Sequence, residues 1–299
     1  MFLKVILPLF LLAGVGFLLG RYRHVGARRP TNAVLYLFLP VLMFTSLVRN
    51  PLGAAEAGRY VTWYWGYLLC AWSGAYLVAR LRGWDRPTRS AVALGLTGLN
   101  CGSYGAPVVL FALGEGALSG AMLLVALSNI SAGSVGVYIA AGGTRSSLQA
   151  LASVFRLPLI YALLLALIVH GLDLHLPEQV LTVGHAVGMG GPMLALVVLG
   201  IQLAGIDVRG GQLRLVAGVT LAKLLGGPAL GIGLAAALGA RGVAWQTLLI
   251  YSCMPTAING LLLAVRYGAH PELLGGILVG TTVLSPLTIT AVLALFGPG

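Results

Sequence analysis

The chain has 299 residues, of which 59% are hydrophobic and only 8% are Asp, Glu, Lys or Arg. A soluble domain carries about 25% charged residues because its surface faces water, so this composition excludes an ordinary soluble protein. The formal net charge of +11 lies mostly in short connections between apolar segments, which excludes the basic face of a nucleic-acid-binding domain.

Apolar stretches of about 20 residues recur along the whole chain, and each is long enough to cross a hydrocarbon core of about 30 Å. Backbone polar groups in lipid must be satisfied within the segment, so these stretches are predicted to be helices. The prediction is an all-α integral membrane protein with ten spans and no extramembrane domain. The spans are 2–20, 31–48, 60–80, 88–112, 117–140, 148–171, 178–204, 212–238, 244–266 and 271–296.

Basic residues are distributed unevenly between the connections. No small-residue cleavage site follows residues 1–20, so we do not expect them to be removed as a signal peptide. An excess of arginine marks the cytoplasmic side, which places both termini outside the cytoplasm of a bacterial-type inner (plasma) membrane. The odd-numbered connections and the span ends that adjoin them hold Arg21, Arg23, Arg28, Arg29, Arg80, Arg82, Arg86, Arg89, Arg145, Arg209, Arg214 and Arg266, against Arg49, Arg59 and Arg241 at the even-numbered ones.

The two halves of the sequence resemble each other. Each half would hold five helices, an odd number, so the second half would be inverted in the membrane. Inverted repeats are typical of secondary transporters. Chance is the alternative, because Leu-Pro pairs and glycines are common in such helices. The matches are Pro8 with Pro158, Pro40 with Pro192, and Gly114 with Gly268.

The fourth and ninth spans carry polar interruptions at 99–107 and 251–260. Both combine Pro, Gly, Asn and hydroxyl residues, and proline and glycine favour an interrupted helix. Interrupted segments at matching places in two halves indicate a transporter's binding site, and the half-helix N-termini there favour an anion. Two ordinary proline kinks packed by small residues are the alternative.

These segments carry a family resemblance that covers essentially the whole chain. Their order and spacing are similar to those of the auxin efflux carrier family, which includes plant auxin exporters and bacterial carriers of malonate-like carboxylates. The motifs are Asn100 to Pro107 with an apolar run into Gly114, Met254 to Ala257 with Asn259 and then Tyr267-Gly268, Leu39-Pro40, and Pro192 leading to Gly200.

The resemblance implies a fold shared with bile acid:sodium symporters. Residues 1–50 and 148–205 would form a scaffold panel, and residues 60–140 and 211–298 would form a core in which the broken fourth and ninth helices cross. Substrate would bind between panel and core, and the core would move against the panel in alternating access. The resemblance also allows a homodimer formed through the panel.

By the same resemblance, Asn100 and Asn259 would hydrogen-bond a substrate carboxylate. An asparagine offers donors and acceptors without the cost of burying a charge in a membrane. Capping of the broken helix ends is the alternative role for both. The full set of expected substrate-binding residues is Asn100, Ser103, Tyr104, Pro107, Lys223, Pro255, Thr256 and Asn259.

Lys223 lies about halfway along the eighth span, too far from either end for easy snorkelling. An ionisable residue inside the membrane is a functional candidate whose partner should be named. Two partners are predicted as alternatives: carbonyl groups at the helix crossing, where the ammonium would replace a bound cation, or an anionic substrate. A snorkelling lysine is the third reading.

No acidic residue falls in the middle of a predicted span, because Glu178 and Glu272 lie within the first two residues of their spans and the other five acids lie in connections. This argues against a carboxylate sodium site or an acidic proton relay. Cation sites built from carbonyls alone, and histidine relays, remain open; we expect His170 and His185 to be interfacial. Ser128 and Ser131 either line the core site or bond between helices. The seven acids are Glu56, Asp85, Glu115, Asp173, Glu178, Asp207 and Glu272.

The leading hypothesis is a secondary transporter of a small organic anion, proton-linked or without a coupling ion. The alternatives are a sodium-coupled symporter of the bile-acid type and a membrane sensor that transports nothing. A membrane-embedded enzyme is disfavoured, because the sequence shows neither metal-ligand spacing nor a nucleophile–base set. No cofactor is expected, and the substrate, the direction of transport and the oligomeric state are left open.

Overall fold

The computed structural model describes residues 2–143, 157–206 and 212–296, and every regular element in these ranges is a helix. Among these residues, seven stretches are long and apolar enough to cross a membrane: 6–23, 28–49, 86–113, 115–140, 178–204, 213–237 and 271–296. Shorter apolar helices cover 158–171 and 258–267. The all-helical membrane class is therefore confirmed, whereas ten spans and inverted repeats stay predictions.

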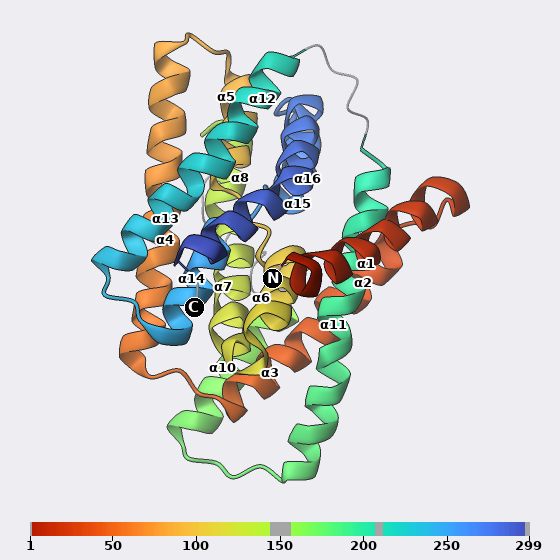
Figure 1. Ribbon diagram of the computed structural model, residues 1–299, viewed down its shortest axis with the longest axis vertical. Coiled ribbons are helices and arrows are strands. Elements are labelled where there is room, and N and C mark those ends of the chain that lie inside the picture. Colours follow the sequence, from red (N-terminus) through yellow and green to blue (C-terminus); the bar gives the residue numbers. More distant parts are fainter. Residues whose placement is uncertain (1, 144–156, 207–211, 297–299) are drawn as a thin grey trace. The chain divides into compact units, whose positions relative to one another are not determined.

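The chain divides into two compact units (Figure 1). The first comprises the described parts of 1–60, 101–126 and 155–205, and the second those of 61–100, 127–154 and 206–299. The predicted division into panel and core stays a prediction. It differs from this grouping mainly in residues 101–126, which fall in the first unit with the segments predicted as panel.

The first unit is organised around α11 (Glu178–Ala204), which packs against α1 (Phe2–Arg23) and α3 (Leu39–Arg49). A Cβ on Gly16 would lie 1.9 Å from the Val197 carbonyl oxygen, and one on Gly200 would lie 1.9 Å from the Ala13 carbonyl oxygen. Only glycine permits this mutual backbone approach. The remaining elements are α2 (Arg28–Ala33), η1 (Val34–Phe38), η2 (Cys101–Gly105), α6 (Ala106–Leu113), η3 (Glu115–Ala117), the first part of α7 (Leu118–Ser131) and α10 (Pro158–Gly171).

The second unit holds most of α4 (Ala54–Leu81), and its helices carry the two interruptions predicted from the sequence. Figure 1 shows α5, α12 and α16 of this unit together, and contacts join α5 to α16 and α12 to α16. The remaining elements are α5 (Arg86–Thr97), η4 (Ala132–Gly136), α8 (Val137–Ala140), α12 (Leu213–Leu221), η5 (Ala222–Gly226), α13 (Gly227–Ala237), α14 (Gly242–Ser252), α15 (Ile258–Tyr267) and α16 (Pro271–Phe296).

Three of the wide π-helical turns share one cause. Pro40, Pro107 and Pro228 each follow such a turn by two residues. Proline has no N–H to give the carbonyl four residues earlier, and its ring crowds that carbonyl, so the backbone widens locally instead of keeping the regular ladder. The predicted single helices at 31–48 and 212–238 therefore contain a π turn, and the turn at 222–226 includes Lys223.

Candidate substrate site at two helix interruptions

The first interruption ends α5 at Thr97. Gly98 leaves the helical conformation at φ −66° and ψ 122°, and residues 98–100 are not helical. The chain then turns into η2 and α6. The predicted fourth span, 88–112, is thus two helices separated by three residues of extended or irregular backbone.

The second interruption separates α14 from α15. Helix α14 ends at Ser252, residues 254–257 are not helical, and α15 begins at Ile258. Pro255 explains the break, because it cannot donate to the preceding turn and it disfavours a helical conformation at the residue before it. Both predicted interruptions are therefore present.

The two interruptions meet. The Asn100 backbone N–H donates to the Pro255 carbonyl oxygen at 3.0 Å. A Cβ on Gly98 would lie 3.3 Å from the Ala257 nitrogen and 2.9 Å from the Leu94 carbonyl oxygen, so glycine is needed where the segments come together. Unwound backbone at membrane depth is tolerated where such mutual pairing satisfies it.

Side chains close the carbonyl end of α5. The Lys223 ammonium, 2% exposed, donates to the carbonyl oxygens of Leu96 at 2.7 Å and Gly98 at 3.0 Å, and to the Tyr67 hydroxyl at 3.2 Å. Thr256 Oγ1 donates to the Gly95 carbonyl oxygen at 2.8 Å. Of the two partners predicted for Lys223, the contacts are those of the carbonyl partner, and its exposure excludes a snorkelling lysine.

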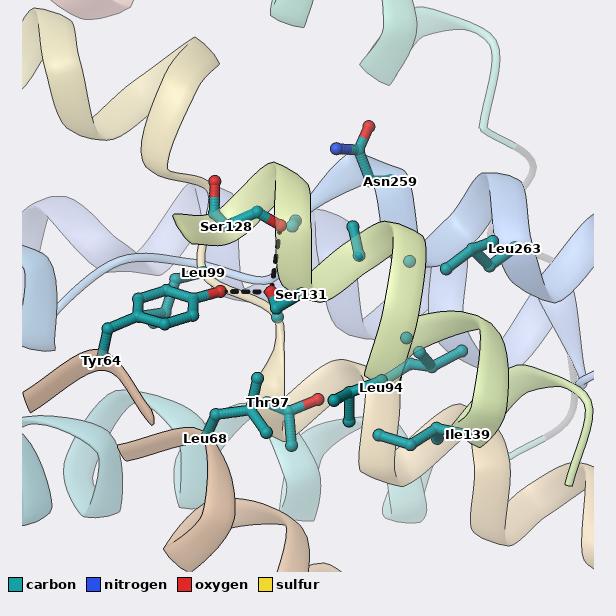
Figure 2. A pocket seen from close by; sticks show the side chains of 16 residues that line it. Tyr64, Leu68, Leu94, Thr97, Leu99, Ser128, Ser131, Ile139, Asn259 and Leu263 are labelled. Carbon is teal, nitrogen blue, oxygen red and sulfur yellow. Dashed lines mark hydrogen bonds between the residues drawn. The ribbon is translucent and has the colours of Figure 1, made fainter. Parts of the chain in front are cut away.

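A small cavity of about 40 Å³ adjoins the interruptions (Figure 2). It is lined by the end of α5 with Gly98 and Leu99 and by the start of α15 with Ala257 and Asn259. Ser128 and Ser131 of α7 also line it, as one of the two readings of these serines predicted. Tyr64 and Ser131 point toward each other and hydrogen-bond at 2.5 Å. A cavity of this size admits water or a small polar group, because one water needs roughly 10–15 Å³ in this measure.

The two predicted asparagines differ in their surroundings, since Asn259 lines the cavity and Asn100 does not. Asn100 is only 4% exposed, and its Nδ2 has no hydrogen-bond partner within the described residues. Asn259 is half-buried on the cavity wall, and in Figure 2 its amide is turned away from the Tyr64–Ser131 pair. A buried amide donor without a partner calls for an explanation, and a bound ligand or water is the ordinary one.

The other predicted site residues belong to the first unit. Ser103 is half-buried in η2, Tyr104 is buried in the same turn, and Pro107 lies buried at the start of α6. Their substrate contacts stay predictions, as do those of Asn100, Pro255, Thr256, Asn259 and Lys223.

Sequence reasoning missed Tyr64 and Thr97, which also line the cavity. Tyr64 carried a signal, because Tyr60, Trp63, Tyr64 and Tyr67 follow one another at helical spacing and place an aromatic face on α4 toward the interior. Thr97 gave none, since a threonine before a glycine is common at any helix end.

The interfacial position expected for His185 stays a prediction, and the structure shows the partners of its ring. His185 is 8% exposed in the first unit, with Nδ1 3.4 Å from Thr45 Oγ1 and Nε2 3.1 Å from Glu115 Oε2. A connection acid folds back onto a helix histidine here, which span boundaries alone do not predict. His170 is exposed at the end of α10.

Comparison with known proteins shows the family to which this chain belongs. A family model described as "Membrane transport protein" matches residues 143–293, which include Lys223 and the second interruption. The chain belongs to this family, the auxin efflux carriers. It is also 26% identical over 297 residues to an "Uncharacterized transporter" of Methanothermobacter thermautotrophicus (strain Delta H), with 95% of this chain and 94% of that protein covered. This auxin efflux carrier family member is thus a multi-pass membrane transporter.

Proposed function

We propose that this protein carries a small organic anion, most simply a carboxylate, across the plasma membrane by alternating access. The proposal includes ten transmembrane helices in two inverted repeats and both termini outside the cytoplasm. It rests on the site where the two helix interruptions meet, because that site combines the unpaired Asn100 amide donor, the uncapped N-terminus of α15 and, among the described residues that line the cavity, no acidic side chain.

The electrostatics of the cavity favour an anion. Helix α15 begins at its wall, and Ala257, at the N-cap position, makes no side-chain cap. The first N–H groups of a helix have no intrahelical partner and carry the positive end of its dipole. None of the described residues that line the cavity is acidic, so a carboxylate meets donors without an opposing charge.

The contacts of Lys223 provide an argument about which ion, if any, is coupled to transport. Its ammonium already occupies the carbonyl oxygens at the end of α5, which are the ligands that a sodium ion prefers. A cation at this position would displace a buried, triply hydrogen-bonded charge. This contact supports transport that is proton-linked or has no coupling ion over the sodium-coupled alternative.

Transport by purified protein in liposomes tests the proposal. We expect uptake of at least one small mono- or dicarboxylate, equally with and without sodium, and loss of that uptake in Asn259→Ala. The matched control is Asn32→Ala, which removes an exposed asparagine of α2. Sodium-dependent uptake would favour the bile-acid-type symporter, and binding without flux would favour a sensor. Equal uptake by both variants would contradict the site.

A further inference from the structure

A second and much larger space lies in the second unit, away from the two asparagines. It is a crevice of about 670 Å³ formed by one face each of α4, α5 and the α12–η5–α13 segment. Most of the side chains that line it are apolar or glycine. The described residues along it include no acid, and its cations are Arg82, Arg214 and Lys223.

Two helix faces run the length of the crevice. On α4 the lining residues Tyr67, Ala71, Gly74 and Val78 recur every three or four positions, and Gly218 and Gly226 lie on the opposite wall. Nothing lies within 4 Å of where a Cβ on Gly74, Gly218 or Gly226 would be, and all three glycines are exposed. The crevice is therefore an open, narrow slot with a largely apolar lining.

The charges are not spread evenly along this slot. Arg82 follows the C-terminal end of α4, and Arg214 lies in the first turn of α12. Both arginines are exposed, and within the described ranges neither pairs with an acidic side chain. Trp84, a residue type enriched at the level of lipid headgroups, lines the crevice beside them.

Lys223, the third cation that lines the crevice, is buried, whereas the two arginines are exposed. The Lys223 ammonium is buried and donates to Leu96, Gly98 and Tyr67, and it also lies 5.2 Å from the centre of the Tyr67 ring. The Lys223 charge is therefore satisfied by protein groups. An anionic group is therefore expected at Arg82 and Arg214, and an apolar group along the rest of the crevice.

We propose that the crevice binds an anionic phospholipid, with its phosphate between Arg82 and Arg214 and one acyl chain along the glycine-lined slot. Clustered arginines next to membrane helices attract anionic headgroups, and basic pockets between such helices bind phosphate-bearing lipids. A water-soluble carboxylate would leave the apolar length of the slot unfilled. The lipid site is independent of the proposed transport site and would hold α4 against α12.

Native mass spectrometry of the purified full chain in detergent, titrated with phosphatidylglycerol or phosphatidylcholine, tests the lipid site. We expect preferential binding of phosphatidylglycerol. In the double variant Arg82→Gln/Arg214→Gln its affinity should fall by about 30-fold, because each arginine near a lipid surface contributes on the order of a fivefold factor. The control Arg29→Gln/Arg80→Gln removes two exposed arginines that do not line the crevice, and it should bind like the wild type.

A second pair of variants tests the acyl chain. Gly218→Leu adds a side chain in the crevice at a position where nothing lies within 4 Å of the new Cβ, and it should weaken binding of both lipids. Gly233→Leu, at another open glycine of the same segment outside the crevice, should not. Equal binding of the two lipids, or an equal loss in the arginine control, would overturn the proposal. Displacement by glycerol phosphate alone would also overturn it, since that would show a headgroup site without an acyl chain. Competition by a transported carboxylate would assign the crevice to the transport path instead.

Discussion

A backbone hydrogen bond from Asn100 to Pro255 joins the two helix interruptions, yet the protein satisfies the polar groups of only one of the two helix ends with side chains. The carbonyl end of α5 is closed by the protein itself, through Lys223 and Thr256. The N-terminal end of α15 has no side-chain cap, and Asn259 in its first turn lines a cavity. A broken helix pair exposes carbonyl groups that attract a cation and N–H groups that attract an anion. Here side chains close the carbonyl end of α5, and the N–H end of α15 has no side-chain cap.

The beginning of α5 can be compared with the beginning of α15, because α5 has a side-chain cap and α15 has none. Asp85 caps α5 by accepting a hydrogen bond from the Thr88 N–H at 3.2 Å, as expected for a surface helix start. The beginning of α15 has alanine, Ala257, at the N-cap position and no side-chain cap. Omitting a cap is reasonable where a ligand is to satisfy the same N–H groups.

The largest loss of thermal stability is expected from a substitution at the carbonyl end of α5, which Lys223 and Thr256 close. Lys223→Met keeps the length of the side chain but leaves the Leu96 and Gly98 carbonyls without their donor. We expect a loss of about 3 kcal/mol or more, because buried acceptors lose charge-assisted hydrogen bonds. The thermal midpoint in detergent measures it, with Leu225→Ala at an exposed site of the same π turn as control. An unchanged midpoint would show that these contacts do not hold the interruption together.

A substitution of Asn100, the unpaired amide of the first interruption, should affect ligand response and not basal stability. Asn100→Ala removes a buried amide whose Nδ2 has no partner in the described structure, so we expect the unliganded midpoint to change little. A carboxylate at 100 times its dissociation constant stabilises the wild type by about 2.7 kcal/mol, and the variant should lose most of this gain. A variant that is strongly destabilised without ligand would instead indicate that Asn100 is a structural cap.

A smaller effect is expected for Thr256. Thr256→Val is nearly isosteric and removes only the bond from Oγ1 to the Gly95 carbonyl oxygen, while the backbone N–H still donates to Thr281 Oγ1. We expect a loss of about 1–2 kcal/mol in thermal stability. Thr290→Val provides a comparison, because its hydroxyl has no partner within the described residues, and its midpoint should not fall.

The smallest effect concerns the capped beginning of α5. The hydrogen bond from Thr88 lowers the pKa of Asp85 below its usual 3.8. The ionised carboxylate therefore favours the folded state above pH 3.8, and this contribution is lost as the pH falls through the lowered value. Asp85→Asn keeps a cap but cannot titrate, so the difference between the two midpoints should shrink on acidification. A constant difference from pH 6 to pH 3 would contradict this.

Much of the site was predictable from the sequence. Proline and glycine within apolar spans predicted both interruptions, because one removes a donor and the other permits extended backbone. The position of Lys223 in mid-span marked it as a functional candidate, with carbonyl groups, an anionic substrate or snorkelling as the alternatives; the structure shows the carbonyl contacts. The lining role of Tyr64 was not predicted, since its aromatic neighbours on α4 indicate only that this face is buried.

Composition and hydropathy alone determined that this chain is a helical membrane protein, because lipid leaves the backbone no alternative. The positions of proline and glycine in the sequence indicated where two of these helices break. Only the tertiary structure decided which broken end is closed, since that depends on distances between residues more than 100 positions apart. Lys223 reaches Leu96 and Gly98 because the π turn before Pro228 and the end of α5 are brought together, and no local pattern encodes that meeting.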